Sequence, residues 1–324
     1  MDLDYGKSPH LWLELISTLA QWRDSGVDGF RCDVASLVPA DFWKQARTRV
    51  NQYDPGMRGE RSPLVWLAES VHPAFLKTMR DAGYGAWSEP ELHAAAFDLT
   101  YDYDGWERLE KIWKGALPLG VYLDYLYVQE TLYPKGAKKL RYLENHDQER
   151  AARRFGKGAL LRAWTALYQF LPGVSMAYMG QELALSHKPD LFERDPIARE
   201  EGEASFTPFF EACLRATKEA KRNAPYGAWT LLEQGTVLYL RSARPLAMPS
   251  TIDPAWLDEG SYLLIAQTGA PAGEAERQPA SYSALDSMPW TVSGFDMLSG
   301  ERVRLNKGDP LSASPAMILR IERT

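Results

Sequence analysis

The chain has 324 residues, 45% of them hydrophobic and 25% charged, a composition typical of globular proteins with enough apolar material for a buried core. Its 37 basic and 43 acidic residues give a net charge of −6, so nucleic acid and anionic membranes are not expected as partners. No apolar run of about 18 residues predicts a membrane span, and the polar start does not predict a secretory signal peptide. Two cysteines, Cys32 and Cys213, form no disulfide framework, which favours a reduced, cytoplasmic protein.

The first predicted element is an amphipathic helix that ends at Gly26. Ser8 can cap this helix, and Pro9 suits its first turn. Apolar residues follow at helical spacing, which predicts that one face of the helix packs on a core. These residues are Leu11, Leu15, Leu19 and Trp22.

Short apolar strands then alternate with helices. Strands are predicted at 27–35, 64–69, 96–101, 140–144 and 174–179, and helices at 39–50, 73–82, 105–130, 159–170 and 206–222. Such alternation is typical of parallel strands covered by helices. About five parallel strands are too few to close a (β/α)8 barrel, so residues 1–228 are predicted to form an α/β domain that is an incomplete TIM-type barrel.

The pattern changes near Trp229. Strand-like segments at 236–244, 261–268, 290–298 and 316–323 are separated by Gly, Pro and Ser, without helical periodicity. This arrangement predicts a small antiparallel β domain over residues 229–324.

Three acidic residues, Asp33, Glu69 and Asp147, lie at or near the C-terminal ends of predicted strands. In β/α proteins this end of the strands faces the active site, and the intervals of about one and two β/α units would let the three acids converge without a metal. Two such carboxyls suit glycosidic cleavage, because one must protonate the leaving oxygen and another must attack the anomeric carbon in its ionised form.

Arg31 precedes Asp33 by two residues, so both side chains are expected on the same face of the strand. A guanidinium there would hold Asp33 ionised and fixed. Taken alone, a strand-end Asp is more often a cap or turn residue, and His146 could be a structural histidine. The interpretation therefore depends on all three acidic sites occurring in order.

At these residues the sequence resembles the α-amylase family, glycoside hydrolases with a (β/α)8 barrel. The similar segments are 29–35 (GFRCDVA), 66–69 (WLAE), 144–147 (ENHD), 173–182 (GVSMAYMGQE) and 1–5 (MDLDY). They resemble the fourth-, fifth-, seventh- and eighth-strand motifs of that barrel and the stretch that joins its inserted B domain to the third barrel helix. The β region at the end of the chain resembles the family's C domain.

The resemblance implies a retaining hydrolase of α-1,4-glucosidic bonds in starch or maltooligosaccharides. Asp33 would be the nucleophile and Glu69 the acid/base. Asp147 and His146 would bind the −1 sugar together with Arg31. No cofactor is implied.

The sequence also departs from the family pattern. It has no counterpart of the first three barrel strands, of their Asn-His motif or of the B domain. Ser36 and Leu37 stand where Lys-His often occurs, so a structural calcium ion is not expected. An open sheet would expose two edges and an apolar face, which predicts a homo-oligomer that completes the barrel, or a piece of a longer gene product. Alternatives are a catalytically impaired carbohydrate-binding remnant and a related α-glucan or sucrose transglycosylase.

Overall fold

The computed structural model describes residues 3–52, 63–247, 250–269, 286–311 and 314–322. The chain forms two compact units, one of residues 1–107 and 125–140 and the other of residues 108–124 and 141–324. The predicted boundary between residues 228 and 229 falls inside strand β6, Tyr226–Leu231, and the predicted domain division stays a prediction. Residues 1, 2 and 323 of the predicted segments lie outside the described residues.

One sheet is built from five strands in the order β1-β2-β3-β4-β5, with parallel pairing along the first four. The strands are β1 Gly29–Cys32, β2 Val65–Ala68, β3 Leu99–Tyr101, β4 Lys138–Arg141 and β5 Val174–Ser175. Together with the second, antiparallel sheet, they confirm the predicted fold class of an incomplete α/β barrel followed by β structure.

The described residues contain these α-helices: α1 Pro9–Asp24, α2 Ala40–Gln52, α3 Pro73–Asp81, α4 Glu89–Ala95, α5 Tyr103–Trp113, α6 Gly120–Leu132, α7 Ala151–Phe155, α8 Ala159–Phe170 and α9 Thr207–Asn223. The helical region predicted over 105–130 contains two helices, α5 and α6, because α5 ends before Gly115, which has a φ of 72°, and Pro118 lies in the connection to α6. The short helices α4 and α7 were not predicted.

Helix α1 spans the predicted range, but its N-terminal cap and the packing of its last turn differ from the prediction. Ser8 occupies the N-cap position without a side-chain capping hydrogen bond. In the last turn, Trp22 is 58% exposed, whereas Arg23 is buried and donates to the Val50 carbonyl at 2.7 Å. The predicted apolar stripe therefore stops at Leu19, and Arg23 takes the inner position because its guanidinium finds a carbonyl partner there.

The core of the first unit lies against the face of the sheet that carries Phe30 and Trp66. These two residues are register partners on β1 and β2, and their rings lie 5.2 Å apart. Trp43 from α2 and Phe97 complete the aromatic packing, with ring centroids 5.3 Å apart. The opposite face of the same strands carries Gly29 and Arg31, which alternate with Phe30 and Cys32 as strand geometry requires.

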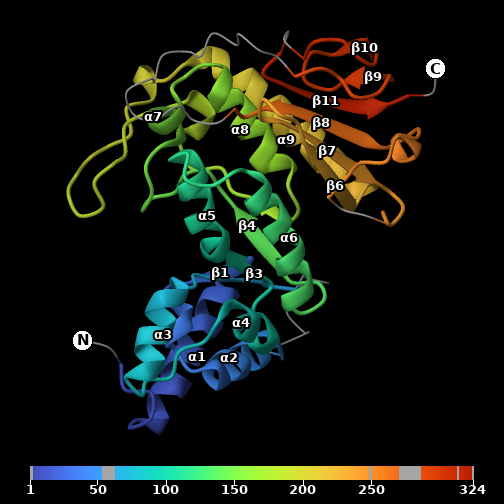
Figure 1. Cartoon of the computed structure of the whole chain (residues 1–324). Coiled ribbons are helices and arrows are strands. Elements are labelled where there is room, and N and C mark those ends of the chain that lie inside the picture. Colours follow the sequence, from blue (N-terminus) through green and yellow to red (C-terminus); the bar gives the residue numbers. More distant parts are fainter. Residues whose placement is uncertain (1–2, 53–62, 248–249, 270–285, 312–313, 323–324) are drawn as a thin grey trace. The chain divides into compact units, whose positions relative to one another are not determined.

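The second unit contains a six-stranded antiparallel sheet in the order β10-β9-β11-β8-β7-β6. Its strands are β6 Tyr226–Leu231, β7 Thr236–Ser242, β8 Tyr262–Gln267, β9 Val292–Asp296, β10 Glu301–Leu305 and β11 Ala316–Ile321. Four of these were predicted, and β6 and β10 were not. Helices α8 and α9 pack beside this sheet (Figure 1), which explains why α8 is buried along most of its length.

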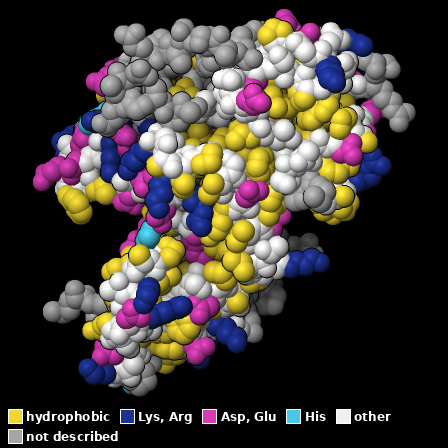
Figure 2. Space-filling model, viewed as in Figure 1, with side chains coloured by type: hydrophobic (Ala, Val, Ile, Leu, Met, Phe, Trp, Pro, Cys, Tyr) yellow, Lys and Arg dark blue, Asp and Glu magenta, His cyan; other side chains and the backbone are white. Residues whose placement is uncertain are grey.

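None of the helices in the described ranges is long and apolar enough to cross a membrane. On the face shown in Figure 2, basic and acidic side chains are interspersed with hydrophobic ones. This distribution agrees with the nearly balanced numbers of charges in the sequence, 37 basic and 43 acidic.

Candidate active site

Arg31 and Asp33 stand at the end of β1. Arg31 lies within the strand, and Asp33 follows its last residue. The Arg31 guanidinium forms the predicted ion pair with Asp33, and its Nη2 atom lies 2.7 Å from Oε1 of Glu69. One guanidinium thus joins two of the predicted acids, which come from neighbouring strands.

The pairing of β1 with β2 places Glu69 opposite this site. Cys32 and Ala68 are register partners, and the ladder continues because Glu69 N donates to the Cys32 carbonyl at 2.9 Å and Ala35 N donates to the Glu69 carbonyl at 2.8 Å. Glu69 follows the strand directly, so its side chain reaches the face that carries Arg31.

Val34 turns the chain sharply after Asp33. Its φ of 42° and ψ of 40° are left-handed, a conformation that costs a non-glycine residue about 1–2 kcal/mol and that is rare for a β-branched residue. The turn directs the Val34 N–H to Oε2 of Glu69 at 3.0 Å. Backbone strain of this kind concentrates at functional sites, where the surrounding structure holds it in place.

The two carboxyls have different surroundings. The Asp33 side chain is 75% exposed and that of Glu69 only 12%. Burial raises the pKa of Glu69, and the neighbouring Asp33 raises it further through a hydrogen bond and a negative charge. The Val34 N–H and the Arg31 charge act in the opposite direction and lower it. Burial acts to lower the pKa of Arg31, but hydrogen bonds to Tyr101 and Asp33 and the Glu69 charge raise it overall. The raised pKa of Glu69 favours its protonated form, and Arg31 stays charged.

Tyr101 is a further residue of this site, which the sequence analysis did not single out. It ends β3, and its ring centroid lies 5.8 Å from the Arg31 guanidinium carbon. Because Leu99 is the register partner of Leu67, Tyr101 continues the strand at the level of Glu69. The signal that could have found it is its position at the end of a predicted parallel strand.

His146 and Asp147 belong to the second unit and follow β4. The buried Asn145 side chain accepts hydrogen bonds from the backbone N–H groups of Asp147 and Gln148, each at 2.9 Å. His146 Nε2 lies 3.2 Å from Oδ2 of Asp147, and Lys188 Nζ donates to the Asp147 carbonyl at 2.7 Å. The structure thus brings Arg31, Asp33 and Glu69 together in one unit, and His146 and Asp147 together in the other.

A buried ion pair supports the 144–147 segment. Glu144 Oε1 lies 2.7 Å from Nη1 of Arg150, and both side chains are almost fully buried. Arg150 also donates to the carbonyls of Met179 and His187, each at 2.9 Å, and lies over the Tyr178 ring. The pair therefore fixes the segment that carries His146 to the chain that follows β5. Sequence reasoning missed Arg150, because nothing in its local pattern marks it as buried.

No metal site is evident in the described part of the chain, where no three His, Cys, Asp or Glu side chains are grouped to hold an ion. Cys32 and Cys213 are both buried and free. The expectation that no structural calcium is bound stays a prediction.

Known proteins that are similar to the chain include an alpha-amylase and a neopullulanase. No protein-family model matches it. Alpha-amylase MalA from Haloarcula japonica is 29% identical over 176 residues, which cover 54% of this chain and 23% of that protein. Neopullulanase 2 from Thermoactinomyces vulgaris is 24% identical over 205 residues, which cover 61% of this chain and 31% of that protein. The matches therefore span about a quarter to a third of these relatives.

The fold gives a longer match. The crystal structure of an alpha-amylase from Lactobacillus plantarum superposes with a TM-score of 0.79 at 28% identity, covering 98% of this chain and 67% of that chain. This similarity includes both the parallel sheet and the antiparallel sheet. In sequence and in fold, the chain resembles the α-amylase family of glycoside hydrolases.

Proposed function

We propose that the chain acts as a retaining glycoside hydrolase on α-1,4-glucosidic bonds of starch or maltooligosaccharides. The observation that carries the proposal is the contact of one guanidinium, that of Arg31, with the two carboxyls of Asp33 and Glu69. The similarity to alpha-amylase MalA and to the alpha-amylase structure supports the same substrate class.

In this mechanism the exposed Asp33 carboxylate attacks the anomeric carbon while Glu69 gives its proton to the leaving glycosidic oxygen. Arg31 orients Asp33 through their ion pair, and burial raises the pKa of Glu69, which favours the protonated acid. In the second step Glu69, now a carboxylate, takes a proton from water as that water attacks the anomeric carbon and releases Asp33.

The proposal includes retention of configuration because Asp33 acts as nucleophile and Glu69 as acid/base, the roles that a retaining enzyme needs. One guanidinium, that of Arg31, contacts both carboxyls. The proposal assigns Asp147 and His146 to binding hydroxyls of the −1 sugar as charge develops, an assignment that rests on the sequence motif. It requires no cofactor.

The test is reducing-sugar release from soluble starch and maltooligosaccharides by the wild type and by Asp33→Asn and Glu69→Gln. We expect each substitution to lower kcat by about 10³-fold or more, as for other residues that form or cleave bonds. Asp81→Asn is the matched control, because Asp81 is an exposed acid that pairs with Lys77 within α3, and it should leave kcat unchanged.

A folded wild type without turnover would contradict the proposal and favour the carbohydrate-binding remnant. Product analysis with maltose and sucrose separates hydrolysis from transfer, because a transglycosylase would form longer oligosaccharides together with the released leaving sugar, whereas hydrolysis gives monosaccharides alone.

A further inference from the structure

A cluster of buried polar side chains lies in the first unit and has no part in the bond-breaking steps described above. Its members come from the end of β2, from α4, β3 and β4, and from the segments that begin α5 and follow α6. We call it the Glu89 cluster; it consists of Ser70, Glu89, Thr100, Asp104, Tyr133 and Lys139.

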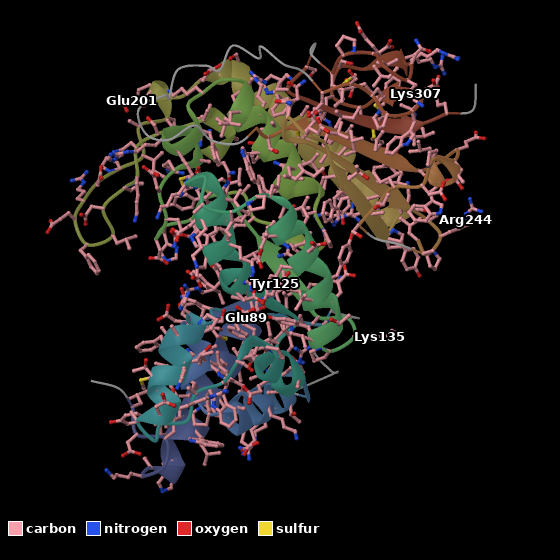
Figure 3. All side chains as sticks on the ribbon, in the orientation of Figure 1. Glu89, Tyr125, Lys135, Glu201, Arg244 and Lys307 are labelled. Carbon is pink, nitrogen blue, oxygen red and sulfur yellow. The ribbon has the colours of Figure 1, made fainter. Side chains whose placement is uncertain are left out.

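Glu89, which Figure 3 labels, contacts four other members of this cluster. Its Oε1 accepts a hydrogen bond from Ser70 Oγ. Its Oε2 accepts one from Tyr133 Oη at 2.6 Å and a longer one from Thr100 Oγ1 at 3.4 Å. The same oxygen is ion-paired with Lys139. One carboxylate, 6% exposed, thus ties together four segments of the unit.

Lys139 is the counter-charge that allows two acids to be buried here. Its ammonium, 5% exposed, contacts Glu89 and lies 2.7 Å from Oδ1 of Asp104. Burial and the Asp104 charge raise the pKa of Tyr133, so the Tyr133 hydroxyl keeps its proton and serves as a donor to the acids. A buried carboxylate held in this way by a cation and hydroxyl donors is fixed in position, because breaking any contact leaves a charge without its partner.

The cluster reaches the candidate site through Ser70, the residue after Glu69. Ser70 is 2% exposed, and its hydroxyl is held by Glu89. The next residue, Val71, donates its N–H to Oγ of Ser36 at 3.2 Å. Ser36 belongs to the 3-10 turn that follows Asp33 and Val34. The backbone that carries Glu69 is therefore anchored from the β1 side by Ser36 and from the opposite side by Glu89.

We propose that Glu89 is a positioning residue that acts through Ser70 to hold the Glu69 carboxyl in place for proton transfer. This inference rests on the proposed function, in which Glu69 is the acid/base. Displacement of a catalytic group by about 1 Å can cost a hundredfold in rate, so the buried anchor matters although Glu89 does not contact the reacting atoms.

Three variants test the proposal. Ser70→Ala removes the hydrogen bond between Ser70 and Glu89 and leaves the Glu89–Lys139 pair intact. Glu89→Gln keeps the shape of the Glu89 side chain but removes its charge. We expect both to lower kcat on maltooligosaccharides by about ten- to a hundredfold while KM changes little, because proton transfer and not substrate binding is affected. Tyr125→Phe is the control: Tyr125, also labelled in Figure 3, contacts the cluster through Asp104, to which it donates at 3.2 Å, and kcat should be unchanged.

A second measurement does not depend on turnover. The Glu69 carboxyl is titrated by NMR in protein labelled with ¹³C at the glutamate carboxyls, with Glu69→Gln used for assignment. Arg31 and Asp33 also face this carboxyl and are kept in every variant. If the anchor holds Glu69 in its buried position, Ser70→Ala should hydrate the carboxyl and move its midpoint to lower pH, and Tyr125→Phe should not.

The outcomes separate the two proposals. An inactive wild type with a Glu69 midpoint that responds to Ser70→Ala would contradict the hydrolase proposal and support the positioning role. A folded Ser70→Ala protein with wild-type kcat and a wild-type Glu69 midpoint would overturn the positioning role while leaving the hydrolase proposal in place. If Glu89→Gln does not fold, Ser70→Ala alone decides.

Discussion

Arg31 is a single cation that contacts two acids in different surroundings. It pairs with the exposed Asp33 and with the buried Glu69, and it opposes the rise that burial imposes on the pKa of Glu69. A neighbouring cation favours the ionised form of a carboxyl, so without it the protonated form of Glu69 should persist to higher pH.

The first prediction follows from this arrangement. Arg31→Met should raise the pKa of Glu69 further, because the cation is lost while the negative charge of Asp33 remains. The Glu69 midpoint in the ¹³C titration should move to higher pH, and kcat should fall because Asp33 loses its partner. Arg80→Met is the control, since Arg80 pairs with Glu91 on the surface. A midpoint that stays in place or moves to lower pH would show that Arg31 does not set the charge of Glu69.

At the scale of elements, the register of β1 against β2 depends on a glycine. A Cβ atom on Gly29 would lie 2.2 Å from the Val65 carbonyl oxygen, which is backbone and cannot move without disturbing the ladder. We predict that Gly29→Ala lowers the free energy of unfolding by about 2–4 kcal/mol through this clash. Urea denaturation measures the loss. Gly85→Ala is the control, because a Cβ there meets nothing within 4 Å, and equal stability of the two variants would contradict the argument.

The loop after β4 offers a second prediction at this scale. Arg150→Ala leaves the buried Glu144 without its cation, and breaking a buried ion pair from one side costs about 3–5 kcal/mol. Arg153→Ala removes the exposed partner of Glu149 in a pair that is 66% and 44% exposed, which should cost less than about 1 kcal/mol. Urea denaturation compares the two variants, and similar losses would mean that the Glu144–Arg150 pair does not stabilise the fold.

Elements whose periodicity matched their burial were predicted well, and those that depend on tertiary partners were not. Helix α8 occupies the predicted range, Ala159–Phe170, because its length and apolar content suit a buried helix. Strand β10, Glu301–Leu305, was missed because its polar residues are mostly exposed. Asp33, Glu69 and Arg31 could be proposed from the sequence because each lies in or just after a predicted strand.

The other features of the site and of the Glu89 cluster could not be predicted from the local sequence. The left-handed Val34 contradicts the preference of that conformation for glycine and asparagine, so the sequence predicts an extended residue there. Glu89 and Lys139 are distant in sequence and meet only in the folded unit. Each would be read as a surface residue from its own neighbourhood.

At the scale of the whole molecule, the parallel sheet has an outer strand, β1, which among the described strands pairs only with β2. On the face that carries Arg31, Val65 is 47% exposed, because its register partner is Gly29 and has no side chain to cover it. The backbone of an outer strand can pair with another chain, and Val65 adds an exposed apolar side chain on the neighbouring strand β2. We therefore propose that the protein associates with a second copy along this part of the sheet.

The last prediction tests this association. Light scattering over a range of dilutions should show a dimer for the wild type and a monomer for Val65→Lys, because a lysine on this face opposes strand pairing and burial of the surface. Val128→Lys is the matched control: Val128 is a similarly exposed valine, 40%, on helix α6 and not on the sheet, so this variant should remain dimeric. Circular dichroism establishes that both variants are folded. A compact wild-type monomer that is stable at every dilution would contradict the proposal, and equal dissociation of both variants would place the interface elsewhere.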